Sequence, residues 1–164
     1  MSAHVIYYGK DKTKQMRPIG SRKEYISLRN SAWQQRLVRG ATTVSRSVGM
    51  DIDHIAADAM TAMKECILAK KDELGLLMLE LSARGAGYHL VFKRRPELTQ
   101  EENLKWASDL LGVAYDEAAK DITRVFYTTT ASEEDLLFLD DGLFDATALQ
   151  CYSSEEKDDV RGKR

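Results

Sequence analysis

Residues 44–53, VSRSVGMDID, decide the fold, because apolar and polar side chains alternate along them. Successive side chains of a β-strand point to opposite faces, so this alternation predicts a strand with one buried face. The apolar side chains on that face are Val48, Met50 and Ile52. Asp51 and Asp53 are predicted to leave the opposite face together, about 7 Å apart along the strand.

The segments that follow predict a helix and a β-hairpin. Apolar residues recur at helical spacing from residue 56 to residue 74, and Gly75 is a typical helix end. Residues 76–81 form an apolar run, which indicates a buried strand. Residues 88–93 alternate again, so they are predicted to pair with residues 76–81 as a hairpin.

A second helix and a fourth strand complete the predicted core. Thr99 and Glu102 have the spacing of a capping box, and Gly112 ends the helix that they begin. Residues 124–129, RVFYTT, are β-branched and aromatic, which favours a strand. The order predicts an α+β fold with an RRM/ferredoxin-like βαββαβ sheet. Both helices would cover one face, and the fourth strand would lie beside the first.

Three regions are predicted along the chain. Residues 1–40 form a basic N-terminal arm or a reduced α/β unit, with an amphipathic helix between residues 25 and 38. Residues 41–150 form the RRM-type core, in which the apolar segment within 133–145 covers a sheet edge as a helix or strand. Residues 151–164 are charged and lack apolar anchors, which predicts a disordered tail.

Charge is divided unevenly along the chain. Residues 1–50 contain ten Lys or Arg residues but only Asp11 and Glu24 as acids, a balance of +8. The net charge is −2, so the remainder carries −10. A basic segment on an acidic body indicates a polyanionic partner, and a solvated, flexible N-terminus explains it equally well.

Composition excludes several classes of protein. An apolar run of about 18 residues, which would span a membrane, does not occur, and the first ten residues lack the layout of a signal peptide. Cys66 and Cys151 have no spacing typical of a zinc site. A cytoplasmic protein with no membrane partner is therefore expected.

The aspartate pair is the first candidate site. Two nearby carboxylates repel each other unless a cation lies between them, and hard oxygen ligands suit Mg²⁺ or Mn²⁺. Such ions can activate an attacking hydroxyl and stabilise a leaving pyrophosphate. Taken alone, the triplet Asp51-Ile52-Asp53 is more often an acidic cap at a strand end than a catalytic motif.

A glycine-bearing loop, SARGAGYH over residues 82–89, strengthens this interpretation. Its two glycines, Gly85 and Gly87, allow backbone N–H groups to approach an anion. Arg84 can pair with phosphate, and His89 follows on the adjoining strand. A plain hairpin turn explains the loop alone better, but not its combination with an acidic pair on the same sheet.

The segment DEAAKDITR, residues 116–124, offers a third carboxylate. Asp116 and Asp121 compete for the role of third metal ligand, and Arg124 is a candidate phosphate ligand. The alternative is that Asp121 and Arg124 form a surface ion pair, which contributes little.

Taken together, the motifs hDhD, S-x-x-G-x-G-Y-H and hD followed by D-x-x-R resemble the archaeo-eukaryotic primase superfamily. The chain is most similar to primase-polymerase-like domains of bacterial mobile elements and phages, the VirE N-terminal-like group. The resemblance covers roughly residues 20–145 and rests on the segments GMDIDHI, SARGAGYHLVFKR, YDEAAKDITRVFYTTT and LLFLDDGLF.

The resemblance implies a metal-dependent nucleotidyltransferase that adds NTP or dNTP to a nucleic-acid 3′-hydroxyl during replication of a mobile element or phage. It implies that Mg²⁺ or Mn²⁺ is held by Asp51, Asp53 and Asp116, with Asp121 as a substitute. Ser82 and His89 would belong to the nucleotide-phosphate motif. The implied partners are single-stranded DNA or a template-primer, the nucleotide, and a fused or separate helicase.

Two other functions stay open. A non-catalytic nucleic-acid- or nucleotide-binding module with the same fold would suit the short chain. Another palm-like metal enzyme, such as a nucleotide cyclase, would share the sheet and the acidic pair but would leave SARGAGYH unexplained.

Overall fold

A computed structural model of the chain describes residues 2–8, 14–29, 37–40, 46–82, 85–115, 117, 126–127 and 133–144. The helices and strands, in chain order, are β1 (Ser2–Tyr8), β2 (Lys14–Pro18), α1 (Arg22–Arg29), β3 (Leu37–Gly40), β4 (Ser47–Ile52), α2 (Met60–Ala69), α3 (Lys71–Leu74), β5 (Leu76–Leu81), β6 (Tyr88–Lys93), α4 (Gln100–Leu111), β7 (Phe126–Tyr127) and β8 (Leu136–Leu139). Short 3₁₀ turns precede α2 and flank β8.

The strands form two antiparallel sheets in a mixed α+β fold. One sheet has the order β4-β6-β5-β8, and the other has the order β2-β1-β3-β7. In the first sheet, β6 lies between β4 and β5. The helices α2 and α3 connect β4 to β5 along the chain, so the two strands that they connect are separated by β6. This is the arrangement of a split βαβ unit.

The central elements confirm the sequence predictions closely. Strands β5 and β6 have the predicted bounds, and β4 is shorter than predicted at both ends. The capping box of α4 is present: the Thr99 hydroxyl accepts from the Glu102 N–H at 3.2 Å, and the Glu102 carboxylate accepts from the Thr99 N–H at 3.3 Å. Local signals fixed these elements because each one is bounded by its own turn or cap.

Two predictions about the periphery differ from the structure. Within the fourth predicted strand, residues 124–129, the structure has β7 at Phe126–Tyr127. This strand pairs with β3 in the second sheet, whereas β8 lies beside β5 in the first. The predicted N-terminal helix ends at Arg29, and residues 37–40 form a strand instead. Periodicity identifies a strand but does not identify its partner, and β-branched Val38 favours extended structure over a continued helix.

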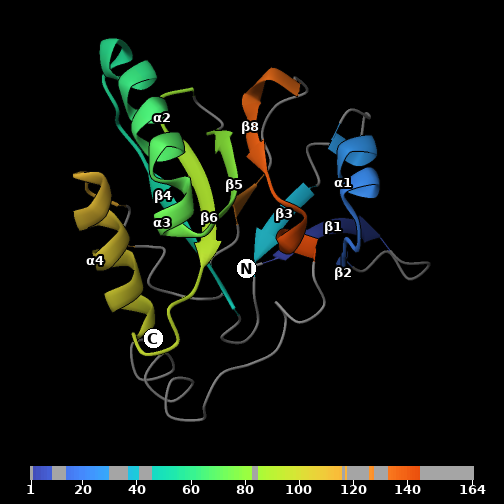
Figure 1. The fold of residues 1–164 in the computed structure, drawn as a ribbon. Helices are drawn as coiled ribbons and strands as arrows, with labels where there is room; N and C mark the ends of the chain where they lie inside the picture. Colours follow the sequence, from blue (N-terminus) through green and yellow to red (C-terminus); the bar gives the residue numbers. More distant parts are fainter. Residues whose placement is uncertain are drawn as a thin grey trace.

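The two faces of the first sheet are covered by different parts of the chain. Figure 1 shows α2, α3 and α4 on one side of β4, β6 and β5, and α1 on the other side. On the helical side, Phe92 packs against Trp106 of α4, and the Tyr88 hydroxyl donates to the Met60 carbonyl of α2 at 2.9 Å. On the other side, the Tyr25 hydroxyl of α1 lies 3.8 Å from the Met78 sulfur of β5.

Candidate functional site

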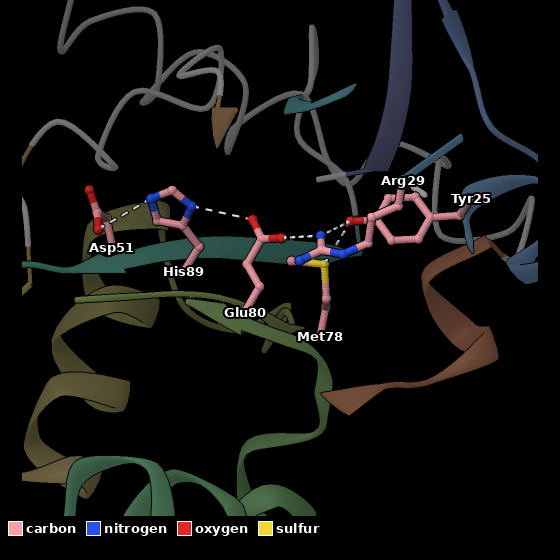
Figure 2. Close-up of polar contacts among 6 residues, drawn as sticks. All are labelled: Tyr25, Arg29, Asp51, Met78, Glu80 and His89. Atoms are coloured by element: carbon pink, nitrogen blue, oxygen red, sulfur yellow. Dashed lines mark hydrogen bonds and ion pairs between the residues drawn. The ribbon is translucent and has the colours of Figure 1, made fainter. Parts of the chain in front are cut away.

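A row of three polar side chains crosses the first sheet on the face that α1 covers. Asp51 of β4 is paired in register with His89 of β6, and His89 is paired with Glu80 of β5. Residues that lie directly opposite one another on neighbouring strands point to the same face, with their Cβ atoms about 5 Å apart. The antiparallel register therefore places two carboxylates on either side of one imidazole, as Figure 2 shows.

His89 contacts both carboxylates through its two ring nitrogens. Its Nε2 lies 3.6 Å from Asp51 Oδ1, and its Nδ1 lies 3.4 Å from Glu80 Oε1. The side chains of Asp51 and His89 are 16% and 11% exposed, and the side chain of Glu80 is fully buried. The row thus runs from the edge of solvent into the interior.

Glu80 continues the row into α1. Its Oε2 lies 2.8 Å from a guanidinium nitrogen of Arg29, which is also buried, and the same nitrogen lies 3.4 Å from the Tyr25 hydroxyl. A buried carboxylate without a counter-charge is strongly unfavourable, so the pair with Arg29 is what allows Glu80 to be charged in the core. Arg29 belongs to the basic segment, but it is buried in the protein and is not part of a solvated arm.

Asp53 has a different environment from Asp51. It follows the last residue of β4, so strand alternation no longer directs its side chain, which is 36% exposed. Its carboxylate accepts from the backbone N–H of His54 at 2.9 Å and lies 3.6 Å from the ring of His54. His54 itself adopts a left-handed conformation with φ of 57°, which marks a tight turn after the strand.

The glycine loop is bonded to this turn. The Ser82 N–H donates to the Gly87 carbonyl at 2.9 Å, and the Gly85 N–H donates to the Ser82 carbonyl at 3.0 Å. The Ala86 carbonyl accepts from the N–H of Ile55 at 2.8 Å. The first two bonds close the loop on itself, and the third holds it against the chain that follows Asp53. Ser82 itself is buried.

The structure therefore brings together six of the predicted site residues: Asp51, Asp53, Ser82, Gly85, Gly87 and His89. Four others lie outside the described residues: Arg84, Asp116, Asp121 and Arg124. Within the described part of the chain, no three His, Cys, Asp or Glu side chains are grouped closely enough to hold a metal ion. The oxygen donors of Asp51 and Asp53 suit Mg²⁺ or Mn²⁺ chemically, and a third ligand is predicted from Asp116 or Asp121.

The sequence did not predict the two buried charged residues next to His89, Glu80 and Arg29. Glu80 is the one charged residue in the apolar strand LLMLEL, and a lone acid in such a run is itself a signal of a buried, paired charge. Arg29 carries no comparable signal, because it is one of ten basic residues in the first fifty. Only the packing of α1 on the sheet distinguishes it from the others.

Comparison of the chain with protein-family models, curated proteins and solved structures gave no match. In the described ranges, none of the helices has the length and apolar character needed to cross a bilayer.

Proposed function

We propose that the chain is a primase-polymerase-like nucleotidyltransferase module, which uses Mg²⁺ or Mn²⁺ to add nucleotides to a nucleic-acid 3′-hydroxyl. The observation that carries this proposal is the junction between the end of β4 and the glycine loop. There Asp51 is paired with His89, and the loop that precedes His89 is hydrogen-bonded to the turn that follows Asp53. An acidic pair and a phosphate-type loop that are far apart in sequence are thus neighbours in space.

The arrangement of the first sheet supports an RRM-like core within the α+β fold. Strands β4, β6 and β5 lie in the order of a split βαβ unit, and the helices cover one face. The acidic pair therefore lies at the end of β4, on the face of the sheet that α2, α3 and α4 do not cover. Residues 1–40 contribute strands and a helix beside this core, which favours a reduced α/β unit over a free arm.

The local charges also favour a cation. Arg29 balances Glu80 in the core, so the negative charge left at the more exposed end comes from Asp51 and Asp53. Asp51 and Asp53 would hold the ion, which when bound supplies Lewis-acid stabilisation of the triphosphate. The loop of Ser82, Gly85 and Gly87 would orient the phosphates through backbone N–H groups other than those of Ser82 and Gly85, which donate within the loop. His89 would lie beside Asp51, with Nε2 3.6 Å from the carboxylate.

A primer-extension assay tests the proposal. The protein is incubated with Mn²⁺, labelled NTPs or dNTPs, and a single-stranded template with and without a primer. Asp51→Asn combined with Asp53→Asn should abolish incorporation, and Asp109→Asn, which removes an exposed carboxylate from α4, should leave it unchanged. If the wild type incorporates no nucleotide, or if the double variant incorporates as much as the wild type, the proposal fails.

A non-catalytic nucleic-acid- or nucleotide-binding module is the second candidate. It is favoured by the contact of Asp51 with His89, which gives this carboxylate a structural partner. Binding of a labelled oligonucleotide, measured over a range of salt concentrations, separates the two. Salt-sensitive binding that survives loss of both aspartates, without any incorporation, would establish this candidate in place of the first.

A further inference from the structure

Arg29 connects α1 to the candidate site through buried charges. Figure 2 shows the side chains in one line, from Asp51 through His89 and Glu80 to Arg29 and Tyr25. Arg29 and Glu80 are each almost completely inaccessible to solvent, and their closest atoms are 2.8 Å apart. The other arginine of this helix, Arg22, is half exposed and pairs with Asp141 at the surface. The two arginines of α1 therefore have different roles.

The pairing with Arg29 determines how Glu80 can bond to His89. A guanidinium does not lose its charge in proteins, so it stabilises Glu80 in the ionised form. An ionised carboxylate has no proton and can only accept hydrogen bonds. The contact of 3.4 Å between Glu80 Oε1 and His89 Nδ1 therefore requires the proton to be on Nδ1. Nε2 then lies 3.6 Å from Asp51 Oδ1. A ring with one proton turns the lone pair of Nε2 toward this carboxylate, whereas a ring with two protons donates to both carboxylates.

We propose that Arg29 is a positioning residue, which acts through Glu80 to fix the tautomer and orientation of His89 beside Asp51. Tyr25 assists by bonding to the same guanidinium nitrogen. In this arrangement α1 is part of the site, although none of its residues would contact nucleotide or metal. The link to nucleotide chemistry rests on the proposed function, whereas the tautomer of His89 does not.

Carboxylates that orient a histidine in this way have measurable effects at a distance. Loss of the partner that orients a metal-bound histidine commonly lowers metal affinity or activity by about 10- to 100-fold, and His89 adjoins the proposed metal ligand Asp51. We expect Arg29→Met combined with Glu80→Met to show a loss in that range for Mn²⁺-dependent nucleotide binding. The double change is preferred because it removes both buried charges and leaves neither one uncompensated.

Nitrogen NMR of the histidine rings reads the tautomer directly in the full chain. The chain has three histidines, so His4→Asn and His54→Asn assign the signals of His89 by elimination. At a mildly alkaline pH, where an ordinary imidazole is neutral, wild-type Nδ1 should show the shift of a protonated nitrogen. In the Arg29→Met/Glu80→Met variant this signal should move toward the unprotonated position.

Two further variants separate positioning from a general loss of structure. Arg22→Met removes a surface arginine from the same helix and should leave both the His89 signals and nucleotide affinity unchanged. Arg29→Lys keeps the positive charge beside Glu80 and should retain the Nδ1-protonated form. Circular dichroism and the methyl NMR spectrum confirm that each variant is folded.

The outcomes distinguish this inference from the proposed function. If His89 carries its proton on Nε2 in the wild type, or keeps Nδ1 protonated in the double variant, Arg29 does not position it and the inference is overturned. If the tautomer changes as expected while the wild type neither binds nor incorporates nucleotide, the positioning role stands and the proposed function fails. If the His89 tautomer and the nucleotide affinity both change in the double variant, the positioning role and the proposed function are both supported.

Discussion

Gly87 lies so close to the end of β4 that a Cβ atom on residue 87 would stand 2.2 Å from the carbonyl oxygen of Ile52. The same atom would lie 3.1 Å from the Cα of Asp53. Both neighbours are backbone atoms, so neither can rotate away. The glycine at this position is therefore required by the contact between the loop and the strand that carries the acidic pair.

Gly87→Ala should separate the loop from β4 and destabilise the protein by about 1–3 kcal/mol, the usual range for overpacking. Because Asp53 adjoins the displaced backbone, Mn²⁺-dependent nucleotide binding should weaken as well. Urea unfolding and nucleotide titration measure the two effects. Gly20→Ala is the matched control, since a Cβ there would meet no atom within 4 Å. A Gly87→Ala protein as stable as the Gly20→Ala protein would contradict the prediction.

Arg29 and Glu80 should be strongly coupled in stability. Arg29→Met alone leaves a fully buried carboxylate without its counter-charge, and Glu80→Met alone leaves a buried guanidinium. Each single change should cost about 3–5 kcal/mol, whereas the double change should be within about 1 kcal/mol of the wild type, because two apolar side chains replace both charges. Urea unfolding of the four proteins completes a double-mutant cycle. Additive costs in the double variant would show that the pair is not coupled.

The part of the fold that could be predicted is the part where local signals agree. The strand pair β5 and β6 and the capped helix α4 each have their own periodicity and their own end signal. The pairing of β7 with β3 could not be predicted, because it depends on which sheet edge lies nearby in space. The presence of the acidic pair and of His89 on one sheet could be predicted, because each lies on a strand that the sequence identifies. The contact of Glu80 with Arg29 could not be predicted, because it depends on the packing of α1 against the sheet.

Tyr88 should make stability depend on pH in the alkaline range. Burial raises the pKa of its hydroxyl above the ordinary value of 10.0, so the folded protein keeps this proton at a pH where the unfolded chain releases it. Unfolding then releases a proton, and this residue's contribution to stability falls as the pH rises above about 10 and is constant below it.

Tyr88→Phe should remove this alkaline dependence and, at about pH 7, cost about 1 kcal/mol through the lost hydrogen bond to the Met60 carbonyl. Urea unfolding at about pH 7 and about pH 11 measures both effects, and the difference between wild type and variant should shrink at the higher pH. If the difference in stability between wild type and variant were the same at both pH values, Tyr88 would not contribute to the loss of stability at alkaline pH.

His54 should carry conformational strain that glycine can relieve. Its φ of 57° lies in the left-handed region, which costs an ordinary residue about 1–2 kcal/mol, and its side chain is 88% exposed, so it gains little from packing. His54→Gly should therefore be as stable as the wild type or more stable by up to about 1 kcal/mol, after the greater flexibility of glycine in the unfolded chain is subtracted. His54→Ala keeps the strain and loses the contact of the ring with Asp53, so it should be the least stable of the three. Urea unfolding ranks the proteins, and a His54→Gly protein less stable than the His54→Ala protein would show that the turn after β4 does not need a left-handed residue.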